Sequence, residues 1–202
     1  MRNARDRRPA CLRVREGILS SLPTGRALGV PLLAAALLAT PAPAAAQASE
    51  VAAKAAFIPR FARYVSWPAA ARPGPRQPYV LCVVGRDPFG RSLDRAAARQ
   101  QIDGRGIVVQ RFASLEGTQG CHIAYVRGAT APDTERMLLA LRERPVLTVT
   151  DSRAGPPRGI IHFTVAAGRV RFFIDEAEAS ARGIAISSRL LALALGVRQR
   201  RP

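Results

Sequence analysis

The sequence has little of the side-chain chemistry on which most enzymes depend. Only two histidines, one tryptophan and a single lysine, Lys54, occur in its 202 residues. It has no H-x-H or H-E-x-x-H spacing for zinc, no G-x-S-x-G for a nucleophilic serine and no C-x-x-C for thiol exchange. His122 and His162 lie in apolar stretches, where a histidine is more often a packed residue than a catalyst or a ligand. We therefore predict that the protein is not an enzyme and has no catalytic residue, no metal site and no cofactor.

Negative charge is also scarce. The chain has only 14 acidic residues but 31 basic ones, and its formal net charge is +17. A surface this basic would suit nucleic acid. However, the arginines are scattered along the chain, without a basic helix or interleaved aromatic residues, and an arginine bias also follows from a GC-rich genome. We therefore predict no nucleic-acid partner.

No apolar run is long enough to span a membrane. The longest candidate, Leu28–Ala39, is shorter than the ~20 residues that a transmembrane helix needs. It follows a basic segment and precedes small residues with A-x-A sites ending at Ala46 or Ala48, which is the layout of a secretory signal peptide. We predict a signal peptide over residues 1–46 and one exported, non-spanning domain over 47–202. An uncleaved anchor is the alternative.

Cysteine is rare as well, and one of the three, Cys11, falls in the predicted leader. The remaining two, Cys82 and Cys121, belong to apolar, strand-like runs. An even pair in an exported chain indicates a disulfide, because the compartment is oxidising. Two buried, unpaired thiols are the alternative.

One stretch, GRDPFGRS (85–92), has the glycine spacing of a phosphate-binding P-loop and follows a predicted strand. Arg91 stands where the P-loop has lysine, and Pro88 removes one of the backbone amides that would cradle a phosphate. An exported protein also has no access to cytoplasmic nucleotides. We therefore interpret the stretch as a structural corner, in which Asp87 caps a helix that Pro88 begins, while Phe89 packs beneath.

Short apolar strands alternate with helical segments over most of the remaining chain. This rhythm predicts an α/β fold with a largely parallel sheet flanked by helices, closed by a C-terminal β-hairpin and a short helix. The expected strands are 79–84, 107–112, 121–126, 146–151 and the hairpin 160–175, and the expected helices are 49–68, 88–100, 131–144 and 187–195.

Two kinds of site are compatible with this arrangement. Ligands bind outside the carboxyl ends of parallel strands, which makes Gly85, Asp87, Phe89 and Asp151 candidates for a ligand crevice, although Asp151 would serve equally as a cap. The N-terminal and C-terminal helices are apolar for elements at chain ends, which packing on the sheet would also explain. Their candidate partner-binding residues are Phe57, Arg60, Phe61, Arg189, Leu190 and Leu193.

Six segments, taken in order, resemble the YfiR family of periplasmic proteins. They are KAAFIPRFARYVSWP, LCVVGRDPFGRSLD, CHIAYV, PVLTVTD, GRVRFFID and GIAISSRLLALA, and together they cover about residues 50 to 197. The resemblance implies a Rossmann-like sheet. It also implies that the protein binds an inner-membrane sensor protein, a diguanylate cyclase or a sensor kinase, through its periplasmic domain. The best-understood family role is repression of a diguanylate cyclase, which controls cyclic di-GMP and biofilm formation.

The resemblance also bears on single residues. Cys82 and Cys121 match the family's paired cysteines, which supports the disulfide. A second cysteine pair found in some relatives within the region matching 150–165 is absent. Asp175 replaces the Asn that the family usually carries, and Asp would cap a helix equally well. A small-ligand-binding sensor module is the alternative function, and self-association into a homodimer stays open.

Overall fold

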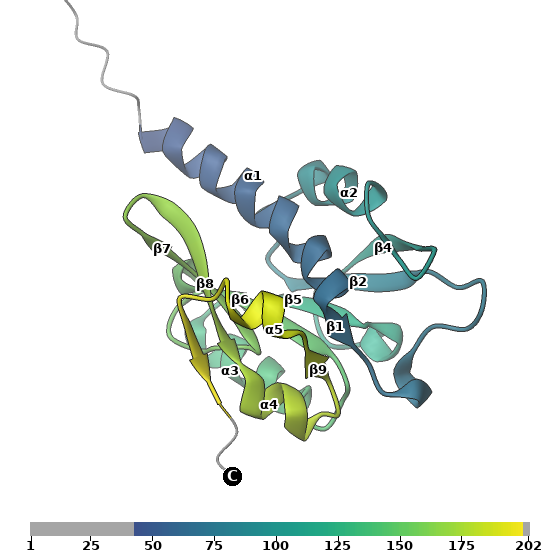
Figure 1. Cartoon of the computed structure of the whole chain (residues 1–202). Coiled ribbons are helices and arrows are strands. Elements are labelled where there is room, and N and C mark those ends of the chain that lie inside the picture. Colours follow the sequence, from purple (N-terminus) through teal and green to yellow (C-terminus); the bar gives the residue numbers. More distant parts are fainter. Residues whose placement is uncertain (1–42, 200–202) are drawn as a thin grey trace, which may run out of the picture. The chain divides into compact units, whose positions relative to one another are not determined.

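The fold is described from a computed structural model, which covers residues 43–199. An eight-stranded, mostly parallel sheet forms its centre, with strands in the order β10-β8-β7-β6-β5-β2-β4-β3 (Figure 1). This confirms the predicted α/β, Rossmann-like class. The strands are β1 (Val65–Ser66), β2 (Tyr79–Gly85), β3 (Gln101–Ile102), β4 (Arg105–Phe112), β5 (Ile123–Arg127), β6 (Leu147–Asp151), β7 (Ile161–Ala166), β8 (Arg169–Asp175), β9 (Ala185–Ile186) and β10 (Gly196–Arg198).

Helices cover both faces of this sheet. They are α1 (Pro43–Phe61), α2 (Arg91–Ala98), α3 (Ala131–Ala140), α4 (Glu176–Ala181) and α5 (Ser188–Leu191). Successive side chains of a strand point to opposite faces, so β2 contributes to two cores. Leu81 and Val83 pack with α1 and α2, whereas Cys82 and Val84 pack with α3. None of the helices within 43–199 combines the length and apolar character that crossing a membrane requires.

Helix α1 begins before the predicted mature N-terminus and ends earlier than predicted. The expected cleavage sites at Ala46 and Ala48 fall in its first turns, and the signal peptide stays a prediction because residues 1–42 lie outside the described part. The helix continues through Pro59 and ends at Phe61, where a 3-10 turn, Ala62–Tyr64, leads into β1. Val65 ends the helical pattern because it pairs with Ile186 of β9, a long-range contact that local periodicity does not reveal.

The predicted disulfide joins Cys82 of β2 to Cys121, with Cα atoms 5.8 Å apart. Both residues are buried in the core beneath α3. The bridge ties the central strand to the segment that enters β5, two neighbours that are 39 residues apart in sequence.

The C-terminal segment contains the predicted hairpin, because β7 and β8 pair antiparallel around Ala167 and Gly168. The final helix is shorter than predicted: α5 ends at Leu191, and the chain then forms β10 alongside β8. Ser187 occupies the N-cap position of α5, but its buried hydroxyl has no hydrogen-bond partner among the residues that the structure describes. The backbone amide of Leu190, not a side-chain cap, closes this turn by donating to the Ser187 carbonyl at 2.9 Å.

Candidate functional site

The order of the strands creates a switch point at the carboxyl ends of β2 and β5. From β2 the chain runs through α2 to β4 on one side, and it then returns to β5 on the other side. Gly85 ends β2 with φ +87°, and a Cβ atom there would lie 2.1 Å from the carbonyl oxygen of Arg127. The next amide, that of Arg86, donates to the same oxygen at 2.8 Å. Glycine is therefore required for the two strand ends to meet.

A hollow of about 520 Å³ opens at this switch point. Ligands of open α/β sheets bind in this position. Of the four predicted crevice residues, only Gly85 lines it. Arg86 brings positive charge to its wall, whereas Arg136 is paired with Asp133, which lines the same hollow. The start of α3 at this edge already has hydrogen-bond partners within the chain, because Thr130 and Asp133 form a reciprocal capping box.

The GRDPFGRS corner differs from its predicted form. Helix α2 begins at Arg91 with Gly90 as its N-cap, so Pro88 precedes the helix and Asp87 does not cap it. Asp87 instead accepts hydrogen bonds from the amides of Phe89 and Gly90, at 2.7 and 3.2 Å, within the turn before the helix. In this turn Gly90 has φ +47°, which is not a helical value, so the helix begins only at the next residue, Arg91.

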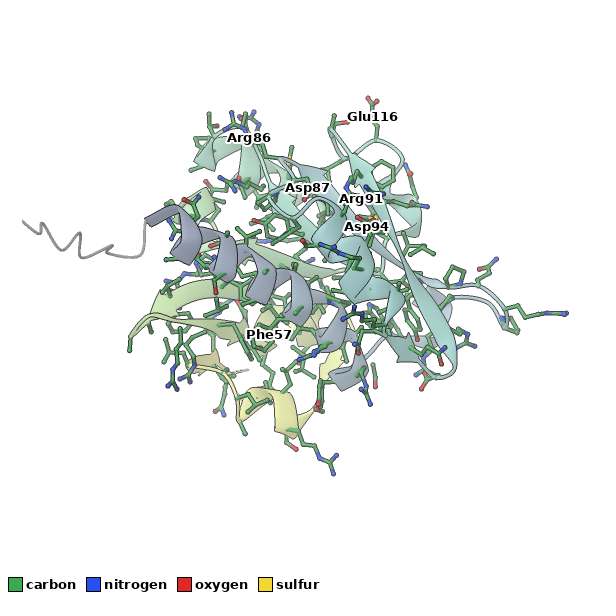
Figure 2. All side chains as sticks on the ribbon, turned by 90° about the horizontal axis from the view of Figure 1, so that it is seen from above. Phe57, Arg86, Asp87, Arg91, Asp94 and Glu116 are labelled. Carbon is green, nitrogen blue, oxygen red and sulfur yellow. A yellow bond between two sulfur atoms is a disulfide. The ribbon has the colours of Figure 1, made fainter. Side chains whose placement is uncertain are left out.

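The side chain of Arg111, on β4, binds two carboxylates of this corner. Its guanidinium donates to Asp87 at 2.7 Å and to both oxygens of Asp94 at 2.7 and 2.9 Å. Hydrogen bonding to Arg111 lowers the pKa of Asp94. Figure 2 shows Asp87, Arg91 and Asp94 near one another around α2. The corner is thus closed by ion pairs and contains no row of free amides for a phosphate.

The other two crevice residues border a buried tyrosine, Tyr125 of β5. Phe89 is buried as predicted, and its ring meets that of Tyr125 edge-on at 4.7 Å. The Tyr125 hydroxyl is fully enclosed and has no hydrogen-bond partner in the described part. Burial raises the pKa of Tyr125, and the negative charge of Asp151 raises it further. Phe89 is therefore a core residue and does not line the hollow at the switch point.

Asp151 is held in a buried charge cluster that sequence reasoning missed. Lys54 of α1 is 1% exposed, and its ammonium group lies 2.6 Å from a carboxylate oxygen of Asp151, which is 4% exposed. Lys54 also pairs with Glu50, one turn earlier on the same helix. Asp151 additionally caps the turn after β6 by accepting from the amide of Arg153 at 3.0 Å. This confirms the capping interpretation of Asp151.

Arg153 completes the cluster. It donates to both oxygens of Glu50, at 2.9 and 2.5 Å. Hydrogen bonds from Arg153 and Lys54 lower the pKa of Glu50 to about 2, against the opposing effect of burial. The sequence did hold a signal for this cluster: the chain's only lysine follows Glu50 by four residues and lies within the apolar stripe of α1.

Both histidines are packed residues, as predicted. The Nδ1 atom of His122 accepts from the amide of Val80 at 3.1 Å, and its ring lies among Trp67 and Tyr79. His162 is buried, with Nδ1 at 2.8 Å from the hydroxyl of Thr150. Burial lowers the pKa of both histidines, that of His162 to about 4. Within the described residues no group of His, Cys, Asp or Glu is arranged to hold a metal ion.

The two predicted partner-binding segments lie side by side, as Figure 1 shows for the end of α1 and for α5. The amide of Ser187 donates to the carbonyl of Tyr64 at 2.9 Å, next to the β1–β9 pairing. The six predicted residues divide by exposure. Phe61 and Leu190 are buried and Phe57 is partly buried, packed on Phe61, Phe163 and Phe172, whereas Arg60, Arg189 and Leu193 are exposed.

Exposed apolar side chains gather after α5. Leu193 is 59% exposed and Leu195 is 43% exposed. We call the exposed residues Arg60, Arg189, Leu193 and Leu195 the terminal surface. The buried residues Phe61 and Leu190 of the same two segments pack in one core, whereas the residues of the terminal surface are open to contact another molecule.

A comparison with known protein families supplies the family. The model described as YfiR/HmsC-like matches residues 51–195, most of the chain. The chain belongs to the YfiR/HmsC-like family. This family consists of periplasmic regulators of cyclic di-GMP signalling and not of enzymes, which gives the chain that general role. No curated protein was found to match the chain.

The YfiR/HmsC-like domain uses its Asp175 as predicted for a cap. One carboxylate oxygen accepts from the amide of Glu178 at 2.9 Å, and the other accepts from Arg198 of β10 at 2.8 Å. The side chain therefore fixes both α4 and the last strand.

Proposed function

We propose that this protein binds the periplasmic domain of a membrane-anchored signalling protein, first of all a diguanylate cyclase, and holds it in its inactive state. Family membership is the observation that carries the proposal. The terminal surface supports it, because two neighbouring segments contribute the exposed leucines Leu193 and Leu195 and the exposed arginines Arg60 and Arg189. Protein interfaces favour such an apolar centre with arginine around it.

Repression sets a thermodynamic requirement. A binding protein shifts its partner's equilibrium only by its difference in affinity for the two states. Moving a partner from almost fully active to almost fully inactive needs about 10⁴-fold tighter binding to the inactive state. The inactive partner must therefore present a surface that the active partner lacks.

The proposal is tested in cells with surface variants. Deleting the gene should raise cyclic di-GMP and surface attachment, and the wild-type gene should restore both. Leu193→Glu should fail to restore them, because a charge at an interface centre typically weakens binding by tenfold or more. Leu139→Glu is the matched control: Leu139 is 50% exposed on α3, away from the terminal surface. Unchanged cyclic di-GMP in the deletion strain, with no membrane partner recovered by crosslinking, would refute the proposal.

The hollow at the switch point favours a second candidate, a small-ligand sensor. Its volume of about 520 Å³ is within the range of ligand sites, and Arg86 offers a cation to an anionic group. A thermal-shift screen of small anionic metabolites should then find a compound that raises Tm. Arg86→Ala should remove that shift, and a screen without any hit removes this candidate.

A further inference from the structure

Some of the basic residues, which the sequence shows as scattered, belong to two neighbouring helices and the turn between them and the sheet. Helices α1 and α2 contact each other and lie side by side in both views (Figures 1 and 2). Five exposed arginines belong to this layer and to the turn that follows α1. We call them the basic layer, and they are Arg60, Arg63, Arg91, Arg95 and Arg99. Arg91 and Arg95 of α2 and Arg99 at its C-cap are spaced four residues apart and so share one face of that helix.

The charge of the basic layer is not compensated nearby. None of the five arginines forms an ion pair among the described residues. The acidic side chains of the same region are already held by other cations: Glu50 by Lys54 and Arg153, and Asp87 and Asp94 by Arg111. Among the described residues, Asp103 in the turn between β3 and β4 and Glu116 after β4 form no ion pair, and two carboxylates cannot balance the five arginines. Uncompensated like charges attract an anionic partner.

The neighbouring side chains indicate what kind of partner this is. Exposed neighbours in the layer, such as Ala52 and Ala98, are small. The large exposed apolar residues of the described part lie on other elements: Val108, Leu139, Val165, Leu193 and Leu195. A protein partner is usually held by a central apolar or aromatic anchor, which the basic layer does not offer. A broad positive layer without anchors fits an extended anionic surface.

We propose that the basic layer adsorbs this protein onto anionic phospholipid headgroups, so that it stays next to the membrane. The setting rests on the proposed function, since a membrane-anchored partner would be met at such a surface. Binding is purely electrostatic, because no large apolar side chain of the layer is available to enter the bilayer. Each basic residue near an anionic membrane strengthens binding about fivefold.

The test uses the purified mature protein and vesicles. It should sediment with vesicles that contain phosphatidylglycerol and not with vesicles of phosphatidylcholine alone. At roughly 1 M salt, where the Debye length is about 3 Å, binding should vanish. The triple variant Arg91→Gln, Arg95→Gln, Arg99→Gln should bind about a hundredfold more weakly.

A control variant removes the same charge elsewhere. Arg142→Gln, Arg169→Gln, Arg171→Gln changes three exposed arginines outside the layer and should keep most of the binding. Circular dichroism checks that both variants are folded. Equal losses in both variants, or no binding of the wild type to phosphatidylglycerol vesicles, would overturn the proposal. Retention on an immobilised acidic protein but not on vesicles would overturn it too, in favour of a protein partner. Vesicle binding needs no signalling partner, so its outcome is separate from the cyclic di-GMP measurement.

Discussion

The buried ion pair between Lys54 and Asp151 leads to a prediction about the free energy of unfolding. Replacing Lys54 by Met shortens the side chain by one atom and keeps its helix propensity, but removes its charge. Asp151 would then remain buried, 4% exposed, with one remaining donor, the amide of Arg153. Glu50 would keep its two hydrogen bonds from Arg153. The uncompensated charge is therefore that of Asp151.

The structure sets the expected size of this effect. Removing one partner of a buried ion pair costs about 3–5 kcal/mol, because the other charge stays desolvated. A domain is typically stable by about 5–15 kcal/mol, so Lys54→Met should remove a large part of the free energy of unfolding. The double variant Lys54→Met, Asp151→Leu should lose much less than the single variant, because no charge is then left in the interior.

Urea unfolding followed by tryptophan fluorescence measures this effect. Trp67 is the only tryptophan and is buried, so it reports on the core beneath α1. Arg60→Met, on the exposed side of the same helix, is the control and should change stability by less than about 0.5 kcal/mol. A Lys54→Met protein as stable as the wild type would refute the reasoning. So would a double variant whose loss equals the sum of its single variants.

Three further predictions concern the disulfide, a histidine and a turn. Thiol titration of the denatured, unreduced mature protein should find no free cysteine, and Cys82→Ser should cost about 2–5 kcal/mol in urea unfolding; two free thiols would exclude the bridge. The pKa of His162 is lowered from 6.5 to about 4, so below pH 6.5 the unfolded chain binds a proton that the folded chain does not. Stability should fall by about 2 kcal/mol between pH 7 and pH 5, and His162→Gln should reduce this loss; an unchanged slope in that variant would contradict the assignment. Ala167 has φ +48° in the β7–β8 turn, a conformation that asparagine tolerates better than alanine. Ala167→Asn should therefore raise the free energy of unfolding by about 0.5–1 kcal/mol. A decrease would contradict the positive φ.

Local sequence patterns predicted the strands that can be recognised from neighbouring residues alone. The runs 79–84 and 146–151 became β2 and β6, and the hairpin 160–175 became β7 and β8. The disulfide was predicted correctly because the prediction needs only an even number of cysteines and an oxidising compartment. The early end of α1 was missed, because Val65 leaves the helical pattern to pair with Ile186, 121 positions later. Periodicity cannot report such a partner.

The candidate sites were predicted less well than the fold. Asp87 has the chemistry of a helix cap, and only the positive φ of Gly90 shows that the helix begins later. Phe61 and Leu190 are as apolar as an interface residue would be, and their burial distinguishes them from Leu193. Lys54 was overlooked because a lone lysine usually belongs to the solvent-exposed face. Its two carboxylate partners come from one turn back and from a distant strand, and the second cannot be read from sequence.

The pairing of the chain's two ends has a consequence for the order of biogenesis. Residues of α1 share one core with Ile184 and Leu190, and within residues 43–199 the strand β1 pairs with β9 alone. The N-terminal segment can therefore complete its contacts only after almost the whole chain has been synthesised. Closing so long a loop is entropically costly and slows folding. We therefore expect a chain truncated before β9 to leave the apolar face of α1 partly uncovered and open to proteases.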